Sequence, residues 1–139
     1  MHKLETAIKT KFDPCGIEVS ARQLVVRLRC QDQEQPRQSF DNTPAGHQAL
    51  LRYLSRSGRT VRVCLEATGR YGLDLCLTLH QARIPLMVVN PRAARHFAQA
   101  LMERSKNDGV DADVLCEFSA RMPFQPWSPP SVTALQWWR

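Results

Sequence analysis

The chain has 139 residues, of which 43% are hydrophobic, and this length and composition suit one domain with a packed core. Lysine and arginine together number 19 against 13 aspartates and glutamates, so the formal net charge of +6 favours a polyanionic partner such as nucleic acid. The chain has neither an apolar run long enough to cross a bilayer nor the apolar core of a signal peptide, which excludes a membrane-spanning or secreted protein and predicts a cytoplasmic one.

The start of the chain is polar and basic, and we expect residues 1–14 to form a flexible leader. Two β-rich runs follow, CGIEVS (15–20) and QLVVRLRC (23–30), and the short polar link between them predicts a hairpin. The run RQSFDN (37–42) is interpreted as a third strand at an edge of the sheet.

A helix with clear boundary residues comes next. Thr43 suits the capping position, Pro44 suits the first helical position, and Gly58 suits the end. Beyond it, the apolar runs VRVCLE (61–66) and PLMVVN (85–90) predict buried strands on either side of a helix, GRYGLDLCLTLHQA. Two strands joined by a helix form a right-handed unit with parallel strands, so the sequence predicts an α/β fold with a mixed sheet and helices on its faces.

Two further helices are predicted in the last third of the chain. PRAARHFAQALMER (91–104) begins at a proline, with Asn90 as its cap, and DADVLCEFSARM (111–122) follows a glycine-containing link. We expect residues 15–122 to form one metal-binding domain, and residues 123–139 to be a proline-rich linker followed by the start of a truncated helix.

The chain contains an odd number of cysteines, and no two of them form a CxxC pair. This pattern is typical of reduced core residues rather than of disulfides or a zinc site. The five are Cys15, Cys30, Cys64, Cys76 and Cys116.

Four carboxylates stand where acids are unusual, and they are the candidate catalytic and metal-binding residues: Glu18, Glu66, Asp108 and Asp111. Glu66 ends a buried strand, and ligand sites of open α/β sheets lie at the carboxyl ends of strands. Each acid also has a purely structural explanation: Glu66 as a cap, Glu18 on an exposed sheet face, and the aspartates as partners of a helix dipole. The two aspartates are three residues apart and would share one face if that segment were helical.

Taken together, the four acids favour a metal site. Neighbouring carboxylates do not stay ionised at close range without a compensating cation, and hard oxygen ligands select Mg²⁺ or Mn²⁺ rather than zinc. Two such ions would activate a nucleophile and stabilise the leaving oxygen of a phosphodiester. The nearby basic residues either hold backbone phosphates or form solvated helix faces. They are Arg70, Arg92, Arg95, Arg104 and Lys106.

The phrases GIEVS, NTPAGHQALLRYL, LEATGRYGLDL, VVNPRAARHFAQAL, SKNDGVDADVL and PFQPWSPP occur in this order along the chain. In this series the chain resembles the DEDD transposases, bacterial insertion-sequence recombinases related to the Piv invertases. The resemblance covers about residues 15–139.

The resemblance implies a RuvC-like domain with a ribonuclease-H-like fold, in which Glu18, Glu66, Asp108 and Asp111 form the metal-binding tetrad. It also implies DNA as substrate, a structured guide RNA as a possible partner, and a C-terminal domain whose serine attacks DNA. No such domain follows in this chain, so we expect a fragment that is inactive alone, and a homo-oligomer for the full-length protein.

Two positions depart from the family pattern, which has Asp where this chain has Glu18 and often Thr where it has Asn107. The extra methylene of Glu18 shifts the carboxylate by roughly 1.5 Å if the backbone stays in place, and the coordination of Mg²⁺ is strict. Besides a recombinase domain, the sequence therefore leaves open a catalytically silent DNA- or RNA-binding module, a stand-alone nuclease for branched DNA, and an α/β domain whose acids are all structural.

Overall fold

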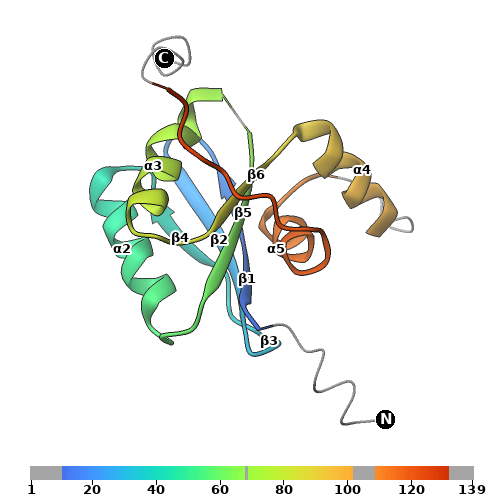
Figure 1. Ribbon diagram of the computed structural model, residues 1–139, viewed down its shortest axis with the longest axis horizontal. Helices are drawn as coiled ribbons and strands as arrows, with labels where there is room; N and C mark the ends of the chain where they lie inside the picture. The colour runs from blue at the N-terminus through green and yellow to red at the C-terminus, as the bar shows by residue number, and fades with distance from the viewer. Residues whose placement is uncertain (1–10, 68, 102–108, 132–139) are drawn as a thin grey trace.

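A mixed β-sheet forms the centre of the molecule (Figure 1). The computed structural model describes residues 11–67, 69–101 and 109–131, and within these ranges the sheet has six strands. The path through the sheet is β3-β2-β1-β5-β6, and β4 also pairs with β2. The strands are β1 (Asp13–Val19), β2 (Gln23–Cys30), β3 (Gln33–Glu34), β4 (Gln38–Asp41), β5 (Val61–Glu66) and β6 (Leu86–Val89).

The predicted hairpin is confirmed, because β1 and β2 pair antiparallel across a turn closed by Ser20 and Gln23. The predicted edge strand is confirmed as β4. β1 begins at Asp13, two residues before the expected start at Cys15. The reason is a long-range ion pair: the Asp13 carboxylate is fully buried and accepts a hydrogen bond from Arg59 Nε at 2.9 Å.

The predicted parallel pairing of β5 with β6 is also confirmed, and β5 additionally pairs parallel with β1, which was not predicted. The connection between β5 and β6 differs from the prediction of one continuous helix. It begins with a short 3₁₀ helix, η1 (Gly69–Gly72), and continues as α3 (Leu73–Gln81). Glycine is a poor α-helix former and 3₁₀ turns are common at helix starts, so the two glycines account for the change.

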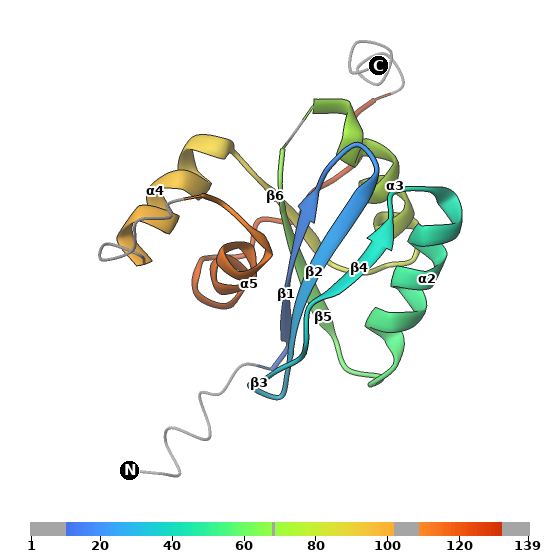
Figure 2. The ribbon, with the colours of Figure 1, turned by 180° about the vertical axis from the view of Figure 1, so that it is seen from behind.

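Helices cover both faces of the sheet, as expected for this fold class (Figures 1 and 2). On one face lie α3 and α2 (Pro44–Ser55), where the Thr43 hydroxyl accepts from Gly46 N as the predicted cap. On the other face lie α4 (Pro91–Leu101) and α5 (Ala112–Arg121). Each face therefore has its own apolar core, one centred on Leu24, Leu50 and Leu75, the other on Leu115 and Phe118.

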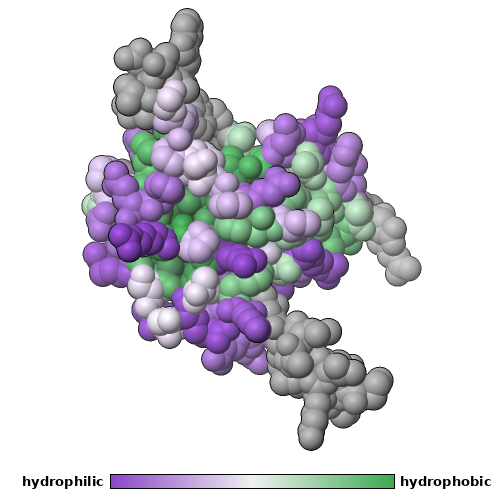
Figure 3. Space-filling model, viewed as in Figure 1, coloured by the Kyte–Doolittle hydropathy of each residue, from purple (hydrophilic) through white to green (hydrophobic). Residues whose placement is uncertain are grey.

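Residues 123–131 form neither helix nor strand, and they run along the sheet at β6, where Trp127 N donates to Leu86 O. In the view of Figure 3, hydrophobic residues gather near the middle of the molecule and hydrophilic ones cover the outer parts on the left.

All five cysteines are free and four are buried, which confirms that they are not in disulfides. Burial raises the pKa of the Cys64 and Cys76 thiols to about 12. None of the helices in the described part of the chain is long and apolar enough to cross a membrane.

Candidate metal and nucleic-acid site

Glu18 and Glu66 lie side by side at the carboxyl ends of β1 and β5. The parallel register pairs Gly16 with Cys64 and Ile17 with Leu65, so the next residue on each strand is one of the two glutamates. Side chains alternate along a strand, so both glutamates share the sheet face of Gly16, which is the face covered by α5. This arrangement follows from the parallel pairing of β1 with β5, which the sequence patterns did not predict.

The electrostatics of Glu66 reflect this neighbourhood. Partial burial raises its pKa, Arg95 on α4 opposes that rise, and the negative charge of Glu18 adds to it. The carboxylate thus sits between one cation and one like charge, and its ionised form is less favourable than in water. A further positive charge at this position would relieve the repulsion between the two glutamates.

Asp111 lies at the same end of the sheet, because α5 runs antiparallel to β1 and β5. Ala112, in the first turn of α5, lies against Gly16 in the middle of β1, and Cys116 Sγ, one turn later, lies 3.5 Å from the carbonyl of Pro14 nearer the start of β1. Ser119, near the end of α5, donates a hydrogen bond of 2.8 Å to the carbonyl of Arg62 at the start of β5. The N-terminus of α5 therefore points to the carboxyl ends of the strands that carry the glutamates.

The backbone of Asp111 is extended, with φ −117° and ψ −174°, and its carboxylate caps α5 by accepting from Val114 N at 3.0 Å. Asp111 therefore stands before the helix as its cap, so the helical segment that would give Asp111 and Asp108 a common face does not include Asp111. Aspartate is among the preferred capping residues, which explains the placement. Asp108 lies outside the described residues.

Sequence reasoning missed an ion-pair network beside Asp111. Arg37, in the link between β3 and β4, donates to Asp111 Oδ2 at 3.3 Å and to Asp113 Oδ1 at 3.2 Å, and its Nη2 forms an ion pair with Asp113 Oδ2 at 2.8 Å. Arg27 on β2 donates to Asp113 Oδ1 at 2.7 Å. Burial alone would raise the pKa of Asp113, but the hydrogen bonds from the two arginines outweigh it and lower the pKa. No local pattern signals these contacts, because the partners are more than 70 positions apart in the chain.

Within residues 11–67, 69–101 and 109–131, no three His, Cys, Asp or Glu side chains converge as a ready-made metal site. The structure brings Glu18 and Glu66 together and turns Asp111 towards Arg37. Of the predicted phosphate-binding residues, Arg70, Arg92 and Arg95 are exposed. Arg92 N also bonds to Asn90 Oδ1 at 2.7 Å, which confirms Asn90 as the cap of α4. Arg104 and Lys106 lie outside the described residues.

Residues 15–136 match the family model of the IS110-type DEDD transposases, described as transposase. The chain belongs to this DEDD transposase family. No curated protein matches it.

Solved structures similar to this DEDD transposase chain include RuvC proteins. The RuvC of T. thermophilus in complex with a Holliday junction substrate is 14% identical, with a TM-score of 0.57 over 84% of this chain and 99% of that chain. A Thermus thermophilus RuvC structure is 12% identical, with a TM-score of 0.50 over 88% of each chain. The predicted ribonuclease-H-like, RuvC-like fold is thereby confirmed.

Proposed function

We propose that this chain is the metal-binding domain of a DNA transposase, in which Glu18, Glu66, Asp108 and Asp111 hold Mg²⁺ or Mn²⁺ beside a DNA phosphodiester. The observation that carries the proposal is the glutamate pair at the strand ends, where the charge of Glu18 helps to raise the pKa of Glu66. Because the paired strands hold two like charges close together, a bound cation would stabilise the ionised form of both glutamates.

The donor chemistry fits a divalent metal, because carboxylate oxygens are the hard ligands that Mg²⁺ and Mn²⁺ prefer. When bound, the ions supply positive charge that activates a nucleophile and stabilises the leaving oxygen of a phosphodiester. The protein's own contribution is placement: β1 and β5 fix the two glutamates in register, and α5 directs Asp111 to the same end of the sheet.

DNA is the proposed substrate, since the family is one of transposases and the similar RuvC structure holds a DNA junction. The net charge of +6 supports binding to a polyanion. We assign the phosphate contacts to the exposed residues around the strand ends and to the link before α5: Arg70, Arg92, Arg95, Arg104 and Lys106. Strand exchange by a larger assembly, with a guide RNA and a C-terminal serine, is part of the same proposal.

Calorimetric titration of Mg²⁺ into the chain and into a Glu66→Gln variant tests the metal site. We expect the variant to bind at least about tenfold more weakly, because it loses a charged ligand. Without metal, we expect Glu66→Gln to melt at a higher temperature than the unmodified chain, because one of two repelling charges is gone. Glu34→Gln, which removes an exposed carboxylate on β3, is the matched control. Equal Mg²⁺ affinity in the chain and in Glu66→Gln would contradict the proposal.

A second candidate function is a catalytically silent nucleic-acid-binding module. Glu18 favours it, because its side chain is exposed and one methylene longer than the Asp of the family pattern. The same titration separates the two functions when a Glu18→Asp variant is included. A silent module predicts Mg²⁺ binding only after this substitution, whereas an active site predicts binding in both proteins.

Arg37 offers an independent prediction, because its guanidinium already supplies a positive charge to Asp111. A metal ligated by Asp111 has to compete with this arginine, so Arg37→Gln is expected to raise Mg²⁺ affinity several-fold. The measurement is calorimetric, with Arg52→Gln on the exposed side of α2 as the control for net charge. Weaker Mg²⁺ binding by Arg37→Gln than by Arg52→Gln would show that Arg37 does not compete with the metal.

A further inference from the structure

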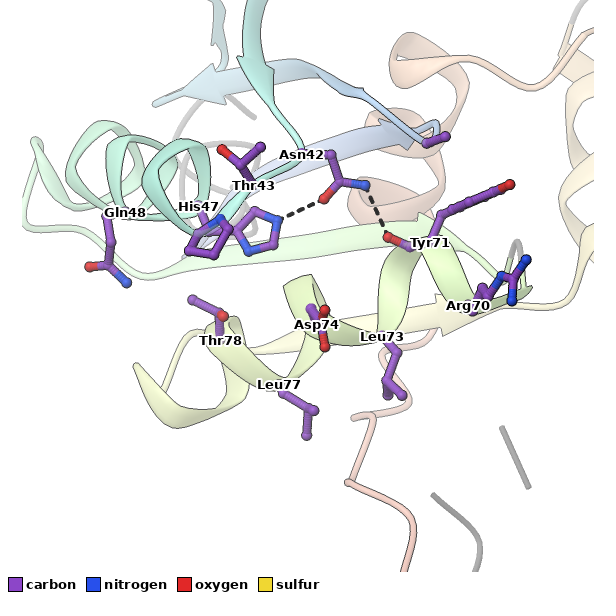
Figure 4. Close-up of a pocket in the computed structure, with 12 residues that line it drawn as sticks. Asn42, Thr43, His47, Gln48, Arg70, Tyr71, Leu73, Asp74, Leu77 and Thr78 are labelled. Atoms are coloured by element: carbon purple, nitrogen blue, oxygen red, sulfur yellow. Dashed lines mark hydrogen bonds between the residues drawn. The ribbon is translucent and has the colours of Figure 1, made fainter. Parts of the chain in front are cut away.

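A cavity of about 740 Å³ opens between α2 and α3, on the sheet face opposite α5 (Figure 4). This volume lies in the range of small-ligand sites, which is roughly 300–1,000 Å³. The cavity is lined in part by Ala21 in the β1–β2 turn and by Tyr71 in η1. These two segments directly follow the strand ends that carry Glu18 and Glu66, so the cavity and the glutamate pair lie at the same end of the sheet.

One wall of the cavity is held rigidly by Asn42. Its amide nitrogen donates to Ser20 O at 2.8 Å and to Tyr71 O at 3.0 Å, and its amide oxygen is 2.7 Å from His47 Nε2. Because an amide oxygen only accepts, His47 donates through Nε2. Burial lowers the pKa of His47, which favours the neutral imidazole with its proton on Nε2. The hairpin turn, α2 and η1 are thus tied together, and the wall is formed before any ligand arrives.

The inner part of the cavity carries neutral and acidic hydrogen-bonding groups. Thr78 and Asp74 point from α3 towards α2, which contributes Gln48 from the other side (Figure 4). Leu73 and Leu77 add apolar surface. The amide of Gln48 and the hydroxyl of Thr78 can pair with the donors and acceptors on the edge of a nucleobase. The carboxylate opposes a bare anion, so free phosphate is a poor occupant.

The rim of the cavity has the opposite character. Arg70 and Tyr71 extend from η1, away from Gln48 and Thr78 (Figure 4). Tyr71 is 48% exposed, which is high for a large aromatic residue. A cation beside an exposed aromatic ring suits the phosphate and base of a single strand. Since η1 begins three residues after Glu66, this rim connects the strand end that carries Glu66 to the rest of the cavity.

We propose that this cavity holds one unpaired nucleotide of a DNA or RNA strand that crosses the end of the sheet, from the glutamate pair on the α5 face to the face of α2 and α3. The neutral base of a nucleotide matches the hydrogen-bonding groups inside the cavity. Its anionic phosphate matches the positive charge at the rim. In a duplex the edges of the base are already paired and stacked, so only an unpaired nucleotide can enter. The inference rests on the proposed function, and it adds a recognition site for single-stranded substrate.

Fluorescence anisotropy of labelled oligonucleotides tests the cavity. The variant Gln48→Ala/Thr78→Ala removes two hydrogen-bonding groups from the helix surfaces and should leave the fold intact. We expect it to weaken binding of single-stranded DNA or RNA about tenfold, while binding of a duplex of the same sequence is unchanged. The control Ser55→Ala/Gln81→Ala removes similar groups from the far ends of the same helices. Single-stranded DNA and single-stranded RNA in separate titrations show which strand the cavity accepts.

An oligonucleotide with one abasic position gives a second readout. If a base enters the cavity, the abasic change weakens binding to the unmodified chain but not to the cavity variant. Equal losses on single strands and duplexes, or no loss on single strands, would overturn the inference. The metal titration separates its failure from that of the proposed function, because the cavity variant keeps its Mg²⁺ affinity and Glu66→Gln does not.

Discussion

Replacing Gly16 with alanine is expected to lower the free energy of unfolding by about 3 kcal/mol, the upper end of the usual range for overpacking. The new Cβ would lie 2.1 Å from Ala112 O and 2.3 Å from Cys116 N. Both are backbone atoms of α5, so no side-chain rotation relieves the contact and the helix has to move. Denaturant unfolding followed by circular dichroism measures the loss.

The same substitution tests how the candidate site is assembled. If α5 lifts away from β1, Asp111 moves relative to Glu18, and Mg²⁺ affinity should fall even under conditions where the variant is fully folded. Gly72→Ala is the matched control, since its Cβ would meet Leu65 Cδ1 at 3.7 Å, an ordinary contact. Similar destabilisation by both substitutions would argue against the close approach of α5 to β1.

The second large effect is expected at the buried carboxylate of Asp13. Arg59 Nε lies 2.9 and 3.1 Å from its two oxygens, and Gln31 N donates to it at 3.1 Å. Arg59→Met leaves a buried charge without its partner, which costs about 3–5 kcal/mol. We expect a much lower midpoint concentration in urea unfolding, with an unchanged m value, which is the slope of the unfolding free energy against urea concentration.

A double variant makes this prediction specific to the ion pair. Asp13→Asn in the Arg59→Met background removes the uncompensated charge and keeps an acceptor for Gln31 N, so it should recover most of the lost stability. Arg52→Met, at an exposed position of α2, should change stability by less than about 0.5 kcal/mol. A double variant no more stable than Arg59→Met would show that packing, not charge, explains the loss.

Local patterns were sufficient for most of the fold. Alternating apolar residues in β1 and β2, the continuous apolar runs of β5 and β6, and the Thr43-Pro44 helix start each specify their element within a few residues of chain. The parallel pairing of β5 and β6 followed from their connection through a helix. The same reasoning placed Glu66 at the carboxyl end of its strand, where ligand sites of α/β sheets lie, and placed Glu18 within the first strand.

The departures from prediction have two physical causes. One is contact between distant parts of the chain, and the other is a competing local geometry. β1 extends back to Asp13 because Arg59, 46 positions away, neutralises its buried carboxylate. Asp111 stands before the start of α5 because its carboxylate accepts a hydrogen bond from Val114 N as the helix cap. Its second oxygen faces Arg37, 74 positions away, which no spacing rule relates to it.

The sequence by itself determined the α/β class, the family, and which acids and strand ends to examine, because hydrophobic periodicity and short motifs are properties of neighbouring residues. Only the tertiary structure decided which charges meet. It placed Glu18 against Glu66, Asp111 against Arg37, and a cavity between α2 and α3. These arrangements depend on strand register and on the packing of α5 over Gly16, and both are set by contacts between residues far apart in the chain.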